Sequence, residues 1–345
     1  MSENKITNIV RVGIDIAKLV FQVHGVDKYG KVCIQAKISR HKLLQFTAQL
    51  RPCLIGMEAC GGAHYWATEF QKQGHKVGLM AGHRVKSYVT SGNKDDKVDA
   101  AAICEAVGRP TMIFIPCKSQ RQLEIQALHR HREQLSKLVN ILSNQIRGLL
   151  LEHGLVIPIG VNNITKKVPG FLEDADNGLS GTMRILIQKI YNQFKETEHK
   201  LADVNKTIEL FCKEDETCRR ICKIPGIGPI TATALYAAIG NGRQFKNGRG
   251  AAAWLGIIPR HSGSGGKTIN GKLSRKGNRY IKTLAIQGGR SIVQASKRKN
   301  DKRSVGINAL QNRKGNNITA VACAHRNIRI AWALMARNEE YKQAA

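Results

Sequence analysis

Residues 9–15 read Ile-Val-Arg-Val-Gly-Ile-Asp, a β-branched run that ends on an aspartate. A short apolar run of this kind predicts a buried strand with Asp15 at its end. Residues 20–26 alternate in polarity, residues 27–30 have the composition of a turn, and residues 31–37 alternate again. These segments predict an antiparallel meander of three strands.

The segments that follow alternate between expected helices and strands. They are a helix over 41–50, a buried strand over 54–58, a helix over 62–74 and a strand over 76–80. Three antiparallel strands followed by strands separated by helices is the order of an α/β RNase H-like fold. The strand over 54–58 ends on Glu58, so if it neighbours the first strand, the carboxylates of Asp15 and Glu58 meet at one sheet edge.

Residues 93–108 are rich in alanine and predict a further helix. Asp96 and Asp99 are three residues apart, so they share a face near its start. Two like charges on one turn repel each other unless a cation lies between them. The alternative is ordinary placement of acids at a helix N-terminus. Asp95 also shares a face with Asp99, which leaves the register of the third acid open.

Composition narrows the classes of partner. The 345 residues include 55 Lys and Arg against 25 Asp and Glu, a formal charge of +30. Such a chain is expected to bind DNA or RNA, and carboxylates kept within its field are expected to hold Mg²⁺. A length of 345 residues predicts two domains with a connecting module.

The expected location is the cytoplasm, in association with the nucleoid. No segment approaches the roughly 20 apolar residues of a membrane span, and the N-terminus has no apolar core of a signal peptide. The nine cysteines are odd in number and form no C-x-x-C, which predicts buried free thiols in a reducing compartment. Cys218 and Cys222 are spaced to share a helix face, but with no partner pair nearby a zinc site is not expected.

The middle of the chain predicts two long helices. The first covers residues 121–151, and residues 153–183, with two prolines and several glycines, are expected to be irregular. The second helix carries apolar residues in alternating steps of three and four, which is typical of a coiled coil. Its seam consists of Ile187, Ile190, Phe194, Thr197, Leu201, Val204, Ile208 and Phe211. The seam either closes an antiparallel hairpin or joins two chains, and a narrow seam on a rod favours oligomerisation.

Residues 224–229 read Ile-Pro-Gly-Ile-Gly-Pro before an expected helix over 231–239. This is the pattern of a helix-hairpin-helix motif, in which Gly226 and Gly228 let backbone amides approach a phosphate at a helix N-terminus. A plain turn between helices is the alternative.

Residues 259–303 contain thirteen Lys and Arg residues and a single acid, Asp301. A solvated charged face mixes both signs, so phosphate binding is the better explanation. Residues 260–267 combine Ser and Gly with flanking cations and predict a flexible loop. The expected nucleic-acid-binding cations are Arg260, Lys267, Lys272, Arg275, Lys276 and Arg279.

The candidate catalytic residues belong to two kinds of chemistry. Asp15, Glu58, Asp96 and Asp99 have the donors to hold two Mg²⁺ or Mn²⁺ ions for phosphoryl transfer. Ser264 lies in the basic loop. Its hydroxyl either attacks a DNA phosphate to form a phosphoserine ester or only donates a hydrogen bond to phosphate.

Taken together, the motifs resemble the DEDD transposases of bacterial insertion sequences, the IS110 family and most closely its IS1111 subgroup. Five stretches carry the resemblance: residues 13–18 (Gly-Ile-Asp-Ile-Ala-Lys), 57–61 (Met-Glu-Ala-Cys-Gly), 92–100 (Gly-Asn-Lys-Asp-Asp-Lys-Val-Asp-Ala), 224–229, and 264–267 (Ser-Gly-Gly-Lys) with 273–278 (Leu-Ser-Arg-Lys-Gly-Asn).

The resemblance implies three regions. They are a RuvC-like, RNase H-fold DEDD domain over 1–118, a coiled-coil region with an irregular insert over 119–215, and a mainly α-helical transposase domain over 216–345. It implies that Asp15, Glu58, Asp96 and Asp99 form the metal-binding tetrad and that Ser264 is the catalytic serine, with Ser262 two residues earlier as its competitor.

The resemblance also implies partners. These are donor and target DNA, a structured guide RNA encoded by the element, and a homodimer or homotetramer in which different subunits combine the two kinds of domain; no membrane is expected. Two other functions fit the residues. One is a metal-dependent, structure-selective nuclease that uses water, and the other is a nucleic-acid-packaging protein without catalysis.

Overall fold

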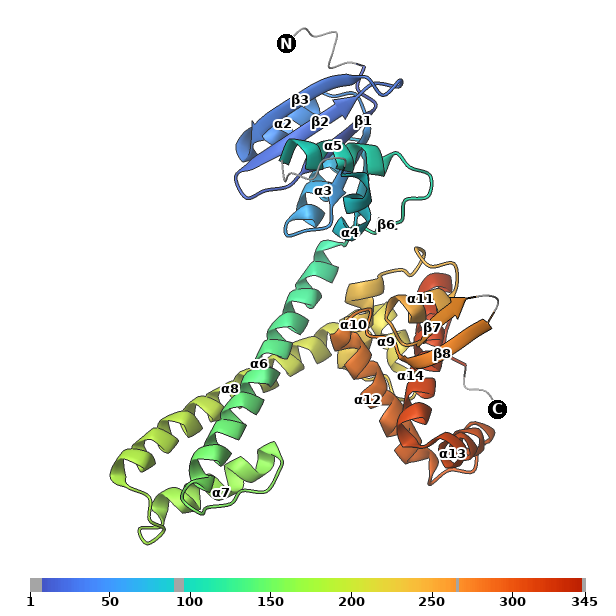
Figure 1. Ribbon diagram of the computed structural model, residues 1–345. Coiled ribbons are helices and arrows are strands. Elements are labelled where there is room, and N and C mark those ends of the chain that lie inside the picture. Colours follow the sequence, from blue (N-terminus) through green and yellow to red (C-terminus); the bar gives the residue numbers. More distant parts are fainter. Residues whose placement is uncertain (1–7, 90–95, 265–266, 343–345) are drawn as a thin grey trace. The chain divides into compact units, whose positions relative to one another are not determined.

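The computed structural model describes residues 8–89, 96–264 and 267–342. The chain divides into two compact units, residues 1–118 and residues 119–345, which are described separately (Figure 1). The three-region division expected from the sequence stays a prediction.

The first unit is built on a six-stranded mixed sheet with the order β3-β2-β1-β4-β5-β6. The strands are β1 (Arg11–Asp15), β2 (Val20–Val26), β3 (Val32–Ser39), β4 (Leu54–Glu58), β5 (Lys76–Met80) and β6 (Phe114–Ile115). Its helices are η1 (Arg40–Lys42), α2 (Leu43–Ala48), α3 (Ala63–Lys72), α4 (Gly82–Val85), η2 (Lys86–Tyr88) and α5 (Asp96–Val107).

The pairing of β1 decides the topology. It pairs antiparallel with β2 and parallel with β4, where Ile14 lies opposite Met57. The expected meander and the expected neighbourhood of the strands that end at Asp15 and Glu58 are therefore confirmed. A mixed sheet in this order is consistent with an RNase H-like domain. Strand β6, antiparallel to β5, was not expected from the sequence.

The two faces of the sheet are covered differently. Val12 and Ile14 of β1 are fully buried in the core that contains Trp66 and Phe70 of α3. Because side chains alternate along a strand, Gly13 faces the other side, where α5 packs. Helix α3 therefore covers one face and α5 the other.

A row of three glycines receives α5. Gly13, Gly56 and Gly78 lie opposite one another on β1, β4 and β5. A Cβ atom on Gly13 would collide with the α5 backbone, with the Cα atom of Cys104 at 2.8 Å, and one on Gly56 would lie 2.7 Å from Cβ of Val107. Helix α5 thus lies directly on the strand backbones, which fixes the position of its first turn.

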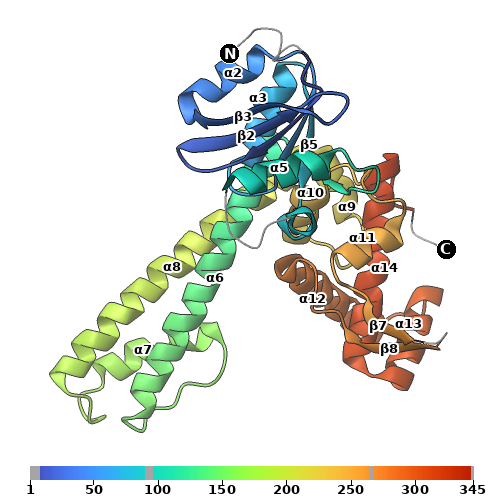
Figure 2. The ribbon, with the colours of Figure 1, turned by 45° about the horizontal axis from the view of Figure 1, so that its top comes forward.

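The second unit begins with a long helical hairpin. Helices α6 (Gln120–Leu151) and α8 (Gly181–Glu214) run side by side, with α7 (Val161–Glu173) at the end of the hairpin (Figures 1 and 2). Ile187, Ile190 and Phe194 of the predicted seam are buried against α6 residues such as Leu142 and Ile146. The seam closes a hairpin within one chain, so the preference for an intermolecular seam was wrong.

Residues 153–183 are not irregular throughout, because α7 lies within them. Ile164 and Val168 are buried on its inner face, which explains why this short helix is held against the hairpin. Pro169 lies inside α7 and has no N–H to donate to the carbonyl of Thr165. The Tyr191 hydroxyl of α8 donates to that carbonyl at 3.5 Å. Local proline chemistry predicted a break, and tertiary packing overrides it.

The rest of the second unit is a helical body with one β-hairpin (Figure 2). Its elements are α9 (Glu216–Cys222), α10 (Pro229–Ile239), α11 (Gly248–Trp254), β7 (Pro259–Ser264), β8 (Lys267–Leu273), α12 (Arg279–Ser296), α13 (Lys302–Lys314) and α14 (Asn316–Arg337). Its core combines Leu235 of α10, Ile281 of α12 and Ile328 of α14. The expected flexible loop over 260–267 is instead mostly hairpin, with Ser262 opposite Ile269.

All nine cysteines are free thiols. Folding brings Cys212 of α8 to 3.2 Å from Cys222, Sγ to Sγ, so Cys222 has a thiol neighbour that sequence spacing did not predict. Among the helices of the described residues, none combines the length and apolar character that a membrane crossing requires.

Candidate active site

The first unit brings two of the candidate carboxylates to one sheet edge. Asp15 is the last residue of β1 and Glu58 the last residue of β4, directly after the paired residues Ile14 and Met57. Because the strands are parallel, both side chains leave the sheet at its carboxyl end. Both are half-buried.

Helix α5 carries the third described carboxylate to the same place. Asp99 precedes Ala100, whose carbonyl lies over Gly13 two residues before Asp15. Burial raises the pKa of the Glu58 carboxyl, and the neighbouring charges of Asp15 and then Asp99 raise it further. The topology of the sheet and the packing of α5 therefore gather three carboxylates, and the charges of Asp15 and Asp99 disfavour ionisation of Glu58.

Two residues near this edge were not singled out by the sequence. A Cβ on Gly82, the first residue of α4, would lie 3.1 Å from Oε2 of Glu58, so the carboxylate rests against bare backbone. The Cys60 thiol has a raised pKa, because of burial and then the charges of Glu58 and Asp15. Neither contact carries a sequence signal, since both depend on how the loops after β4 and β5 meet.

The oxygen donors of this edge suit a hard divalent cation. Within the described side chains, no three His, Cys, Asp or Glu residues are arranged as a finished metal-binding group. The side chain of Asp96, the first residue of α5, lies outside that part of the structure, as does Asp95. Asp15, Glu58 and Asp99 nevertheless form a site of mutually repelling carboxylates, and a divalent cation is the species that relieves such repulsion.

The candidate serine belongs to the second unit. Ser264 is the last residue of β7 and pairs across the hairpin with Lys267, the first residue of β8. The side chains of Ser262, Ser264 and Lys267 lie outside the described part of the structure. Arg260 on β7 and Lys272 on β8 are exposed, so cations flank the strand that carries the serine.

A basic loop, residues 274–278, follows the β7–β8 hairpin, and a side chain of α12 holds its backbone in place. The Lys282 ammonium of α12 donates to the carbonyls of Ser274 at 2.9 Å and Lys276 at 2.7 Å, and burial lowers its pKa. This fixes the backbone around Arg275, which is exposed together with Lys276. Arg279, also exposed, follows at the start of α12.

The glycines of the loop between α9 and α10 differ in their surroundings. Gly226 has φ +86°, and a Cβ there would lie 2.6 Å from Ile292 Cδ1 of α12. Gly226 is therefore required for packing against α12. A Cβ on Gly228 would meet nothing within 4 Å, and this residue is the N-cap of α10, so its backbone is open. The Asn327 amide of α14 donates to the Pro225 carbonyl at 2.8 Å and anchors the loop.

A chain of hydrogen bonds, each with a defined donor and acceptor, connects α6 of the helical hairpin with the start of α10, next to this loop. The Thr233 hydroxyl donates to the carbonyl of Pro229 at 2.7 Å, so it accepts from Nε2 of His129 at 2.9 Å. Nδ1 of His129 then accepts from the Tyr280 hydroxyl at 3.0 Å, and the Tyr280 oxygen accepts from Arg132 at 3.2 Å. Burial, and then the charge of Arg132, lowers the pKa of His129 to about 4, which keeps the ring neutral as this chain requires.

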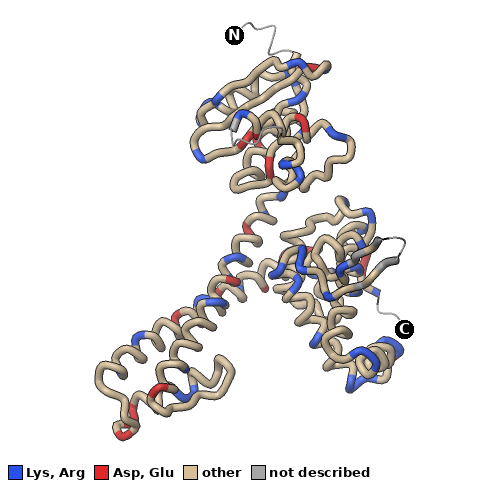
Figure 3. Tube along the Cα trace, in the orientation of Figure 1, with Lys and Arg blue, Asp and Glu red and all other residues tan. Residues whose placement is uncertain are grey.

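Lys and Arg residues recur over the helical body of the second unit, as Figure 3 shows for α12, α13 and α14. Acids in this body are few, and residues 259–303 hold only Asp301, which caps α13 by accepting from the Ser304 amide at 3.0 Å. A body of this charge attracts a polyanion.

Two family models match the chain in regions that correspond to these two sets of residues. Residues 12–154 match a DEDD transposase model described as "Transposase", and residues 218–303 match the model described as "Transposase IS116/IS110/IS902 family". A probable family 20 transposase of Pseudomonas aeruginosa is 40% identical over 97% of this chain and 99% of the relative. The chain belongs to the IS116/IS110/IS902 family of transposases.

Further relatives come from mobile elements of other bacteria. The transposase for insertion sequence element IS1111A of Coxiella burnetii is 37% identical over 97% of this chain and 92% of its own length. The transposase for insertion sequence element IS1328 of Yersinia enterocolitica is 32% identical over 95% and 97%. This IS110-family transposase is thus a DNA-processing enzyme.

Proposed function

We propose that this transposase cuts and rejoins DNA strands through two sets of residues, the carboxylates of the first unit and Ser264 of the second. The observation that supports the proposal best is the convergence of Asp15, Glu58 and Asp99 at the carboxyl edge of β1 and β4. In a chain of charge +30, a cluster of half-buried acids has the opposite charge to the rest of the protein and is expected to bind a cation.

Asp15, Glu58 and Asp99, together with Asp96 at the start of α5, would hold divalent metal, Mg²⁺ or Mn²⁺. Bound there, the metal would supply stabilisation of the negative charge that develops on a phosphate during strand transfer. The protein's own contribution is positional. The glycine row sets α5 against β1, so Asp99 is presented to Asp15 by the fold and not by a flexible loop.

Ser264 is the proposed nucleophile. Its Oγ forms a bond to a DNA phosphorus while the bond from that phosphorus to a deoxyribose oxygen breaks, so the serine loses a proton and the departing oxygen gains one. The phosphoserine ester conserves the energy of the broken bond for rejoining. The exposed cations Arg260, Lys272 and Arg275 would bind the flanking phosphates.

The finer organisation belongs to the same proposal. The N-terminal domain is RuvC-like, the α6–α8 hairpin is a coiled coil, and the α9–α10 loop is a helix-hairpin-helix whose open Gly228 faces phosphate. The partners are donor and target DNA and a structured guide RNA encoded by the element. A homodimer or homotetramer combines the carboxylates of one subunit with the serine of another.

Covalent capture tests this proposal. Purified protein is incubated with DNA from the ends of the element, with RNA transcribed from the non-coding flank of the gene, and with Mg²⁺. Protein–DNA adducts are then resolved after denaturation. Adducts are expected with the wild type and with Glu69→Gln, a half-buried acid of α3 paired with Lys72. They are expected to vanish with Ser264→Ala and with Asp99→Asn.

The variants also separate the alternatives. If Ser264→Ala cleaves DNA at the wild-type rate while Asp99→Asn is inactive, the nucleophile is water and not the serine. DNA binding without any cleavage, unaffected by all four acids, would reduce the protein to a packaging role. Recombination that proceeds without added RNA would contradict the proposed role of a guide RNA.

A further inference from the structure

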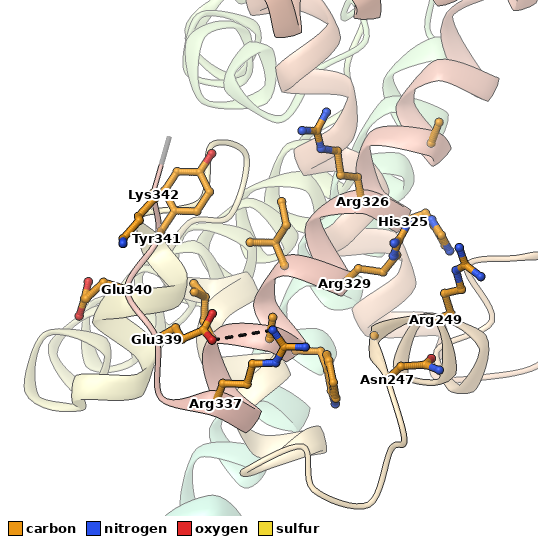
Figure 4. Close-up of a pocket in the computed structure, with 16 residues that line it drawn as sticks. Asn247, Arg249, His325, Arg326, Arg329, Arg337, Glu339, Glu340, Tyr341 and Lys342 are labelled. Carbon is orange, nitrogen blue, oxygen red and sulfur yellow. Dashed lines mark ion pairs between the residues drawn. The ribbon is translucent and has the colours of Figure 1, made fainter. Parts of the chain in front are cut away.

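A second basic surface is formed by residues outside the β7–β8 hairpin and its loop. It is a groove of about 1260 Å³ between the start of α11 and the second half of α14, closed on one side by residues 339–342 (Figure 4). Its charged walls are formed by Arg249 of α11 and by Arg326, Arg329 and Arg337 of α14. None of these belongs to the basic segment over 259–303.

The groove carries more positive charge than its acids neutralise. Arg337 pairs with Glu339 at 3.8 Å, and Glu340 pairs with Lys223 at 2.6 Å. Among the described residues, Arg249, Arg326 and Arg329 form no ion pair, and all three are exposed. Burial lowers the pKa of His325, which lies in the same groove, and the charges of Arg329 and then Arg249 lower it further. Like charges held together in this way favour an anionic ligand.

Close backbone packing brings the two walls together. A Cβ on Gly248 would lie 2.9 Å from Cα of Arg329, so only glycine allows α11 to approach α14 here. Arg249 is the next residue and is thereby placed beside the arginines of α14. Figure 4 shows the Arg249 and Arg329 side chains on the two neighbouring helices.

The spacing of the cations suits a polymer. Arg326, Arg329 and Arg337 follow steps that keep them on one side of α14. The eleven residues from Arg326 to Arg337, which is itself paired with Glu339, rise by about 16 Å. This is the axial length of about five nucleotides of one DNA strand. Arg326 and Arg329, with Arg249 beside them, line an open groove, which a polymer can follow.

Two aromatic side chains line the groove, Trp332 and Tyr341. The Trp332 ring is buried and its Nε1 donates to the Gly242 carbonyl at 2.9 Å. Tyr341 is half-buried, and its hydroxyl accepts from Arg303 at 3.4 Å. The exposed arginines of the groove are expected to contact phosphates, and such contacts are independent of sequence.

We propose that the groove between α11 and α14 binds the phosphate backbone of duplex DNA, as a second DNA contact separate from the β7–β8 hairpin. The choice of DNA rests on the family's activity, and the proposal requires neither the carboxylates nor Ser264. Arg249, Arg326 and Arg329 each contact one phosphate, and the groove holds DNA outside the site of strand exchange.

The salt dependence of binding tests this groove. Fluorescence anisotropy measures the affinity of the full chain for labelled duplex DNA, without divalent metal, over a range of NaCl concentrations. Log K falls as log salt rises, and the triple variant Arg249→Gln/Arg326→Gln/Arg329→Gln is expected to make this negative slope shallower by about 2.7, or about 0.9 for each lost contact. The control Lys166→Gln/Lys167→Gln/Lys189→Gln removes equal charge from exposed positions of α7 and α8, and should leave the slope unchanged.

Three outcomes would contradict the proposal that the groove binds duplex DNA. The first is an equal slope change in the control, which would indicate only general charge. The second is an unchanged slope in the triple variant with a normal melting temperature. The third is a change seen with a hairpin RNA but not with duplex DNA. Adduct formation by Ser264 is measured in parallel, so loss of adducts in the catalytic variants with an intact salt slope would separate this proposal from the catalytic one.

Discussion

The Cα atom of Gly13 in β1 lies directly beneath the backbone of α5, where a Cβ would collide with the Ala100 carbonyl oxygen. This contact sets how far Asp99 reaches toward Asp15. Gly13→Ala is expected to push α5 off the sheet and to lower the free energy of unfolding of the first unit by about 3 kcal/mol, the upper range for overpacking.

Gly61→Ala is the matched control, because a Cβ on Gly61 meets nothing within 4 Å. Thermal unfolding of both variants measures the difference. Equal melting temperatures for the two variants would show that α5 accommodates the methyl group and that the glycine row does not position Asp99.

The pKa of Glu58 has a consequence for stability. A carboxyl whose pKa is higher in the folded than in the unfolded state binds its proton more tightly when folded, so its charged form opposes folding at neutral pH. Without divalent metal, Glu58→Gln is expected to raise the melting temperature at pH 7 and to lose that advantage below the unfolded pKa of about 4.3. Melting curves of variant and wild type across pH test this, and a stabilisation that persists at low pH would contradict it.

The buried His129 predicts acid sensitivity of the second unit. Its pKa of about 4 in the folded state lies below the ordinary 6.5. This difference corresponds to about 3 kcal/mol. The unfolded chain binds the proton first, so stability is full above pH 6.5, falls as the pH drops toward 4 and is flat below it.

His129→Gln removes the titrating ring and should flatten the decline between pH 6.5 and 4, although it is less stable at pH 7 because the chain from Tyr280 to Thr233 is broken. Urea unfolding at several pH values measures both effects. The exposed His199 gives the control variant His199→Gln, and an equal flattening there would remove the special role of His129.

The hairpin of α6 and α8 should depend on its interior aromatic residue. Phe194 is fully buried in the hairpin core. Phe194→Ala is expected to cost about 3–5 kcal/mol. Ile185→Ala, at a side chain 60% exposed on the same helix, should change stability by less than about 0.5 kcal/mol. Chemical unfolding of each variant distinguishes them, and a small loss for Phe194→Ala would mean that the seam is not closed within the chain.

Local pattern predicted most of the elements of the first unit. The runs that end at Asp15 and Glu58 are apolar, short and bounded by turns, so their strands and the edge where they meet could be inferred from sequence. The row formed by Gly13, Gly56 and Gly78 could not be, because three isolated glycines acquire meaning only when the strand register places them side by side.

The misses in the second unit share one physical origin. Helix α7 was hidden by Pro169, whose cost is met by packing and by a partner on α8. Strands β7 and β8 were hidden by their small residues, and the groove arginines by their spacing of three to eleven residues along α14. In each case a contact between segments far apart in the sequence determines the structure, and local propensity cannot predict such a contact.

The glycine row gives the first unit an unusual genetic fragility. Any change in the first or second base of a glycine codon replaces the residue, and at these three positions even one added methyl group meets backbone or a packed side chain. A copy of the gene that drifts under no selection can therefore fall silent through a single base change outside any acidic codon, while its reading frame and all its carboxylates stay intact.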